Sequence, residues 1–241
     1  MSVEMAIFHI EKSQQTAARI AGALYLLTTL ATNFTEFYVH NRLNVTGDAL
    51  HTAQNAAGSA HLVRIGIAGD LLVLAGNTAL IVSLWIVFRP IYKHLCLLGA
   101  IWWLVECSVS AAIVLNHYAG LLLLQGVGCP SPCDPNQAPA LSRFLVYLDT
   151  AGHRVEALFF GLGSLMFCYL WFRSRYVPRL LAALGILASL VPTVIPFLTM
   201  MLPSLQEQYL RKARTGIPIA IFGVMMGIWL LVTKEATSLT G

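Results

Sequence analysis

Apolar stretches of about 20 residues recur along this chain, and a helix of that length crosses a membrane hydrocarbon core about 30 Å thick. Of its 241 residues, 57% are hydrophobic and only 11% are charged, whereas soluble domains contain about 25% charged residues. A soluble fold would leave too much apolar surface in water. The sequence therefore predicts an all-α, polytopic integral membrane protein whose first partner is the lipid bilayer. The net charge of +4 is scattered, and no basic run points to a nucleic acid.

We expect about six transmembrane helices in one membrane-embedded domain covering residues 1–241. The first apolar run is too long for the core of a signal peptide, so we expect a retained helix. Arg89-Pro90 ends another run, because proline disfavours helix in the residue before it. Four spans with polar residues (about 16–172) precede two apolar bracing spans (about 179–233). The expected spans are about 16–38, 61–88, 95–124, 141–172, 179–202 and 215–233.

Lys and Arg residues beside the span ends indicate the orientation. The two tightest loops, 89–93 and 173–179, are strongly basic, and both face the cytoplasm if the N-terminus does. We therefore expect a cytoplasmic N-terminus. Cys129 and Cys133, which bracket a proline-rich loop, would then lie outside, where a disulfide can persist. On a reducing side they would be a thiol pair.

Two shorter features bear on packing. Thr46-Gly47-Asp48 lies in the loop 39–60, and its Asp could cap a short helix through Ala57 by accepting free amide protons. Gly223 and Gly227 have the spacing that lets membrane helices approach closely. We expect this pair to serve packing inside the bundle, while a homo-oligomer stays open.

Ionisable residues inside the apolar runs are the candidates for a functional site, because a charge in the bilayer is costly unless it is paired or hydrated. Asp149, His153 and Glu156 follow at i, i+4 and i+7 and share one helical face, from which Arg154 points away. In the preceding span, Glu106 and His117 lie about three full turns apart and therefore share a face. Three further polar residues are expected to face the same interior, namely Glu36, Asp70 and Asn77.

This interior set is net acidic. Five carboxylates face at most two arginines, Arg64 and Arg154, and a low dielectric does not sustain such an excess of one charge. Some carboxyl groups must be protonated, a cation must be bound, or the interior must hold water.

Several functions remain open on this pattern, enzyme and non-enzyme alike. His117 and His153 with neighbouring carboxylates offer the mixed nitrogen and oxygen ligands that suit a divalent zinc, iron or manganese ion. Such an ion could activate water against a small lipid-soluble ligand or substrate, with Asp149 and Glu156 catalytic. The other polar residues named would then bind the ligand: Glu36, Asp70, Asn77, Glu106 and Arg154.

The alternatives use the same residues differently. The carboxylates and histidines could form the relay of a proton- or cation-coupled transporter. His117 and His153 could hold a haem, although the acidic neighbourhood argues against it. In a structural or regulatory membrane protein, the polar groups would satisfy one another.

Short motifs in a fixed order give the chain a resemblance that covers about residues 18–190. The chain resembles an uncharacterised family of bacterial multi-pass membrane proteins, known only as a domain of unknown function. The resemblance implies a bacterial inner-membrane protein and supplies no activity. Members often have a histidine after Phe-Gly-Leu, where this chain has Gly163. The matching residues are Ala18-Arg19-Ile20-Ala21-Gly22, Leu24-Tyr25-Leu26, Gly47-Asp48-Ala49, Arg64-Ile65-Gly66-Ile67-Ala68-Gly69-Asp70-Leu71, Arg89-Pro90, Leu148-Asp149, Phe160-Gly161-Leu162, Tyr169-Leu170, Arg173-Ser174 and Pro178-Arg179.

Overall fold

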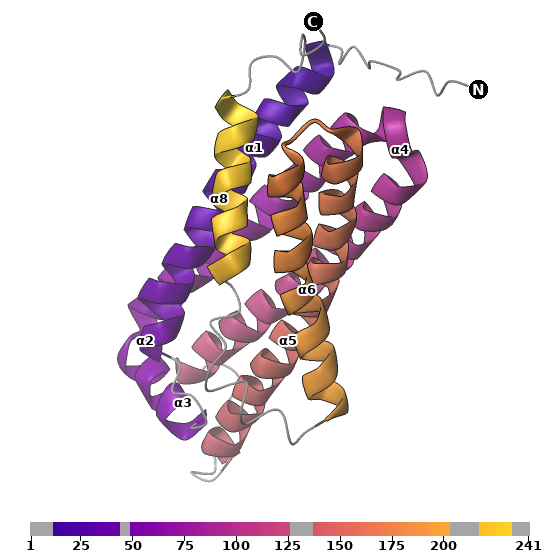
Figure 1. Ribbon diagram of the computed structural model, residues 1–241. Helices are drawn as coiled ribbons and strands as arrows, with labels where there is room; N and C mark the ends of the chain where they lie inside the picture. The colour runs from indigo at the N-terminus through magenta and orange to yellow at the C-terminus, as the bar shows by residue number, and fades with distance from the viewer. Residues whose placement is uncertain (1–11, 44–48, 126–136, 203–216, 233–241) are drawn as a thin grey trace, which may run out of the picture.

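The computed structural model describes residues 12–43, 49–125, 137–202 and 217–232, and over these residues the chain forms helices and turns without a β-strand (Figure 1). The all-α prediction is therefore confirmed. The helices are α1 (Lys12–Phe34), η1 (Thr35–His40, a π-helix), α2 (Asn41–Leu43), α3 (Ala49–Gly58), α4 (Ala60–Leu124), α5 (Gln137–Ser174), α6 (Arg179–Met201) and α8 (Ile217–Val232).

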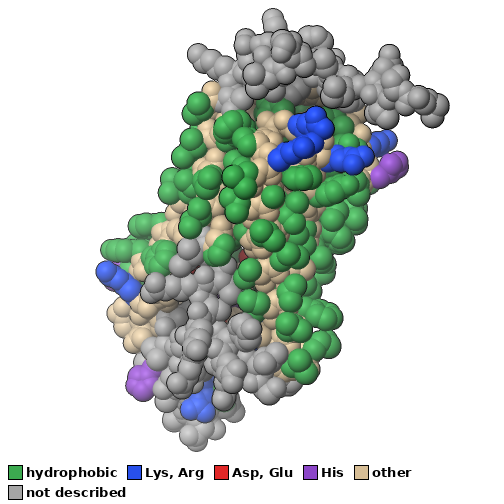
Figure 2. Space-filling model, viewed as in Figure 1, with side chains coloured by type: hydrophobic (Ala, Val, Ile, Leu, Met, Phe, Trp, Pro, Cys, Tyr) green, Lys and Arg blue, Asp and Glu red, His purple; other side chains and the backbone are tan. Residues whose placement is uncertain are grey.

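Within the described residues, three helices are long and apolar enough to cross a membrane: Ala60–Leu123, Arg143–Ser174 and Arg179–Met201. A shorter apolar helix covers Pro218–Val232. Many large hydrophobic side chains on these helices are exposed, including Leu115 and Leu180. Figure 2 shows such side chains over the flank of the molecule, with several Lys and Arg side chains gathered near one end. This distribution suits a membrane protein.

Helix α4 is bent sharply near its middle. Tyr92 has non-helical backbone angles (φ −138°, ψ 63°), and Cys96 Sγ lies 3.9 Å from the carbonyl oxygen of Leu84. The chain therefore turns back on itself, and we call the two parts the first arm (60–91) and the second arm (93–124) of α4 (Figure 1). The expected break at Arg89-Pro90 falls two residues early, because the fixed φ of proline is itself compatible with a helix.

Glycines permit close packing between helices. A Cβ on Gly227 in α8 would lie 2.9 Å from the carbonyl oxygen of Gly22 in α1, and one on Gly223 would lie 2.6 Å from Thr29 Oγ1. The expectation that these glycines pack inside the bundle is therefore confirmed. On the first arm of α4, a Cβ on Gly69 would meet Thr35 Cγ2 of η1, so this glycine lets η1 approach α4.

The apolar core lies toward the end where α4 bends. Phe88 packs edge-on against Trp171 with ring centroids 4.4 Å apart, and Phe167 packs against Trp103 at 4.7 Å. The two basic turns meet beside this core, since the Nε of Arg173 donates a hydrogen bond to the hydroxyl of Tyr92 at 3.2 Å.

Three expectations concern the loops. The short helix through Ala57 is confirmed as α3. The capping residue expected for it, Asp48, and the cysteines Cys129 and Cys133 lie outside the described residues.

Candidate functional site

Four helical segments bring the polar side chains together at the other end of the bundle. His40 closes η1, Asp70 lies on the first arm of α4, His117 lies on the second arm, and α5 supplies Asp149 and His153. The arms of α4 run antiparallel, and α5 packs along the second arm, where a Cβ on Gly152 would lie 2.9 Å from Ile113 Cγ1. Residues distant in sequence thus come to the same position along the length of the helical bundle.

His117 lies between two carboxylates. Its Nε2 is 2.8 Å from Asp149 Oδ1, and its Nδ1 is 3.3 Å from Asp70 Oδ2. Both ring nitrogens therefore point at an acid, which fixes the orientation of the ring. The side chains of His117 and Asp70 are about four-fifths buried, at 19% and 20% exposure, so solvent screens this contact only in part.

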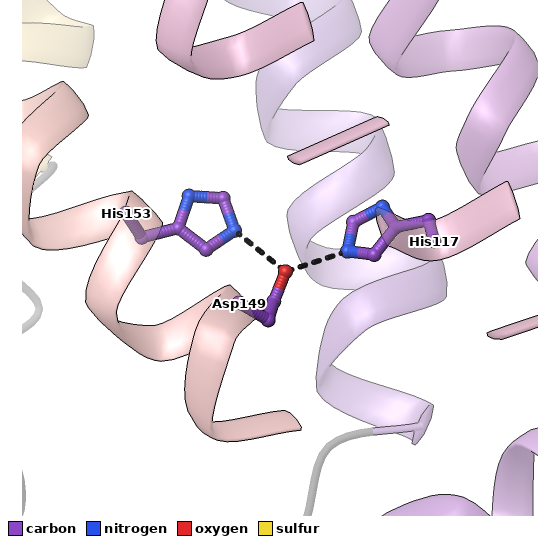
Figure 3. A group of neighbouring side chains, drawn as sticks. All are labelled: His117, Asp149 and His153. Atoms are coloured by element: carbon purple, nitrogen blue, oxygen red, sulfur yellow. Dashed lines mark hydrogen bonds and ion pairs between the residues drawn. The ribbon is translucent and has the colours of Figure 1, made fainter. Parts of the chain in front are cut away.

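His153 repeats this arrangement on the opposite side of Asp149, as Figure 3 shows. Its Nε2 is 3.7 Å from Asp149 Oδ1, the same oxygen that contacts His117, and its Nδ1 is 2.7 Å from Glu156 Oε2. The i, i+4 and i+7 spacing brings this about, because it places all three α5 residues on one face. The side chain of His153 is 49% exposed, so this is the open side of the group.

The contacts continue to a buried acid. The hydroxyl of Ser110 donates to Glu156 Oε1 and lies 3.5 Å from Glu106 Oε1. Glu106 itself is buried, and its Oε2 accepts from the Cys107 thiol at 3.4 Å. An unbroken series of polar contacts therefore leads from His40 to Glu106. We call its members the cluster: His40, Asp70, His117, Asp149, His153, Glu156, Ser110 and Glu106.

Other residues expected at this interior lie apart from the cluster. The side chain of Glu36 is exposed on η1, and Arg64 is exposed near the start of α4. Asn77 and Arg154 are partly buried, but within the described residues neither takes part in the contacts of the cluster. Among the described residues, the ion-pair partners of Asp70, Asp149 and Glu156 are histidines and not Arg64 or Arg154.

Sequence reasoning missed Ser110 and, among the histidines of the cluster, His40. Its Nε2 lies 3.5 Å from Asp70 Oδ1, and its ring is 5.6 Å from that of His117. We expected the first span to end near residue 38, which left His40 at or beyond the membrane interface. Instead, the helical path continues through η1 and α2 to Leu43. The buried Val39 and Leu43, four residues apart, are the signal for this extension.

Three of these side chains could hold a metal ion. One ligand atom from each of His117, Asp149 and His153 lies within 4.8 Å of the others. Metal-binding histidines generally donate their other ring N–H to a carboxylate, a backbone carbonyl or a water molecule, which orients the ring and raises its basicity. Asp70 is such a partner for His117, and Glu156 is one for His153. The donors and their outer partners therefore fit a divalent ion bound by two nitrogens and one oxygen.

A cavity of about 120 Å³ adjoins this group. Its wall is formed by η1, α2, α3, both arms of α4 and the start of α5, and it is mainly aliphatic. The polar exceptions are Thr52, Asn116 and three residues of the cluster, namely His40, His117 and Asp149. A small apolar molecule in this cavity would touch the candidate metal ligands.

Gly163, the position at which the resemblance suggested a histidine, lies away from this cluster. A Cβ there would overlap Trp103 Cδ1, so the glycine makes room for the indole ring. A histidine at this position would require Trp103 to move.

Comparison with known proteins identifies a family but no activity. A family model described as a domain of unknown function (DUF4386) matches residues 20–233. No curated protein and no solved structure matches the chain.

Proposed function

The chain belongs to this family of unknown function, and we propose that it is a six-span membrane protein that binds a divalent metal ion at His117, Asp149 and His153. The six spans would be α1 with η1, the two arms of α4, α5, α6 and α8. The length of α4, 65 residues, supports two crossings, since about 20 residues span the hydrocarbon core. We further propose one domain in a bacterial inner membrane, with both basic turns and the N-terminus in the cytoplasm.

One observation carries the metal proposal. Two histidines from different helices direct Nε2 at the same oxygen of Asp149, and each holds a carboxylate at Nδ1. A buried imidazole needs a partner at each of its two nitrogens in any case, so the support for a metal comes from the convergence of both Nε2 atoms on one oxygen. The duplicated carboxylate–histidine arrangement around a common point is the form that outer-shell support takes in metal sites.

The donor set suits zinc, iron or manganese. Three protein ligands leave a position open, as in catalytic metal sites, and a bound ion would lower the pKa of a water molecule there or polarise a carbonyl oxygen. Asp70 and Glu156 would orient the two histidines, while Glu156 and Ser110 could pass a proton toward Glu106. The chemistry that these parts support is metal-assisted hydrolysis or binding of a lipid-soluble molecule.

Metal analysis of the purified protein tests this proposal. We expect about one equivalent of a divalent transition metal per chain, because the three ligands define one site. His153→Ala should lose it, and His94→Ala should retain it, because His94 is exposed near the bend of α4, away from the cluster. Metal content below about one-tenth equivalent in protein purified without chelator would contradict the proposal.

A second function has support from the length of the polar series. The contacts from His40 through Asp70, His117, Asp149, His153 and Glu156 to Glu106 cross four helical segments. Alternating acids and histidines of this kind carry protons in pumps and transporters. This function predicts proton flux into liposomes that Glu156→Gln abolishes, and flux that survives this variant would count against it.

A further inference from the structure

The end of the bundle at which α4 bends carries a patch of positive charge. The bend and the turn between α5 and α6 meet there, because the Nε of Arg173 donates a hydrogen bond to the hydroxyl of Tyr92 at 3.2 Å. Arg19 of α1 interacts electrostatically with Tyr176 of the same turn. Figure 2 shows Lys and Arg side chains gathered at this end. We call six exposed side chains the basic patch: Arg19, Arg89, Lys93, Arg173, Arg175 and Arg179.

Within the described residues, no acid balances the basic patch. Every ion pair found there joins a histidine to a carboxylate of the cluster at the other end of the bundle. Like charges held together repel one another, and an anion that contacts them relieves this repulsion. The patch therefore favours an anionic partner. The carboxylates of the described residues all lie outside the two basic turns: Glu36, Asp70, Glu106, Asp149 and Glu156.

Two members of the basic patch are held in place by local structure. Tyr92, which engages the Nε of Arg173, is partly buried against the apolar core. This contact orients the guanidinium group and leaves the N–H donors of its two terminal nitrogens. Arg175 has a positive φ of 56°, a left-handed conformation that glycine usually takes at the end of a helix. Backbone strain of this kind is found at ligand-binding sites.

Apolar side chains beside the basic patch indicate what kind of anion binds. Phe172, Leu180 and Ile20 are each adjacent in sequence to an arginine of the patch, and they are 37%, 75% and 49% exposed. A free phosphate ion would leave these side chains uncovered, whereas the acyl chains of a phospholipid would cover them. The planar guanidinium group matches the oxygens of a phosphate, and basic residues at the membrane surface attract anionic lipids.

We propose that the basic patch binds the headgroup phosphate of an anionic phospholipid, with Arg173, oriented by Tyr92, as the principal contact. The acyl chains of this lipid would lie along the neighbouring apolar side chains. A zwitterionic lipid fits less well, because the other cations of the patch would repel its ammonium group. The inference rests on the proposed membrane placement of the helices, but not on the metal ion.

Two lipids with identical acyl chains test the proposal on the delipidated wild-type protein in detergent. Native mass spectrometry would measure the dissociation constants of phosphatidylglycerol and phosphatidylcholine. We expect phosphatidylglycerol to bind about tenfold more tightly, since several basic side chains act on its uncompensated charge. Equal affinity for the two lipids would overturn the proposal. Excess inorganic phosphate should not displace the lipid, and displacement would identify free phosphate as the ligand instead.

Three variants separate a defined site from general attraction by charge. Arg173→Gln should weaken phosphatidylglycerol binding about fivefold. Arg64→Gln removes the same charge from an exposed arginine at the other end of the bundle and should leave the affinity unchanged. Tyr92→Phe keeps every charge and the aromatic ring but releases Arg173, so we expect a loss of about threefold. Equal effects of Arg173→Gln and Arg64→Gln, or full affinity in Tyr92→Phe, would overturn the site.

Metal content measured on the same samples separates this inference from the proposed metal site. Arg173→Gln should retain the wild-type metal content, because the cluster lies at the other end of the bundle. A wild-type protein that holds metal but shows no preference for phosphatidylglycerol would overturn the lipid site alone. A protein that shows the preference without metal would overturn the metal proposal alone. Protein that stays in solution after the detergent is removed would contradict the membrane placement.

Discussion

At the scale of single residues, Asp149 connects the site. Its Oδ1 contacts Nε2 of both His117 and His153, so the three side chains form one group only while this carboxylate is present. Two further acids orient the histidines and are not themselves candidate metal ligands. Asp70 and Glu156 contact the remaining ring nitrogens and hold the imidazoles in position. Loss of either acid should therefore weaken metal binding without removing a ligand.

Asp70→Asn tests this distinction. We expect the metal dissociation constant to rise by about 10- to 100-fold, as for other outer-shell substitutions, because an amide supports His117 less well than a carboxylate. Isothermal titration of chelator-treated protein would measure this constant. Asn77→Ala provides the control on the same arm of α4, since Asn77 lies outside the cluster. A dissociation constant that is unchanged in Asp70→Asn would remove Asp70 from the site.

Some of these residues could be predicted from sequence and others could not. Asp149, His153 and Glu156 lie within one helix, where the regular spacing fixes their common face. The order of helices in a bundle is not encoded in such spacing, so the contacts of α5 with Asp70 and His117 could only be inferred from depth. Glu36 and His40 depended on where the first helix ends, and the apolar pattern fades at that point before the helix does.

At the scale of helices, the position of η1 depends on small residues facing it. Gly69 makes room for Thr35, and a Cβ on Gly66 would lie 3.0 Å from Val39 Cγ1. These contacts set the distance between η1 and the first arm of α4, and therefore between His40 and Asp70. The bend at Tyr92 acts similarly at the other end, because it returns the second arm alongside the first. Pro90 indicated that bend in the sequence, whereas no sequence feature indicated the π-helix η1.

Gly69→Leu should push η1 away from α4. Overpacking of this kind costs about 1–3 kcal/mol, so we expect a lower melting temperature in detergent, measured by tryptophan fluorescence. Gly58→Leu introduces the same side chain where no neighbour lies within 4 Å and should leave the melting temperature near that of the wild type. Equal melting temperatures for the two variants would mean that η1 does not pack on Gly69.

At the scale of the whole molecule, the basic turns and the polar cluster lie at opposite ends of the bundle. The contact between Arg173 and Tyr92 places both basic turns together, as their sequence suggested. If these turns face the cytoplasm, the cluster and its cavity lie in the outer half of the membrane. The number of spans was harder to predict, since α1 and α8 are shorter or less apolar than the three helices that qualify by length and composition.

Cysteine labelling in intact cells tests this orientation. In a background with Cys129 and Cys133 replaced by serine, we expect a membrane-impermeant maleimide to label Arg143→Cys directly. Lys93→Cys, beside the bend of α4, should be labelled only after the membrane is permeabilised. The three remaining cysteines are buried and serve as the background signal. Labelling of Lys93→Cys in intact cells would contradict this orientation and place the basic turns outside the cell.

The position of a bound ion would decide whether His117, Asp149 and His153 form a metal site. A diffraction experiment at the absorption edge of the metal found in the purified protein would locate that ion. We predict an anomalous peak between His117, Asp149 and His153, about 2.0–2.1 Å from each Nε2 if the ion is zinc. A map without a peak at this point, in crystals of protein that was never exposed to chelator, would contradict the account.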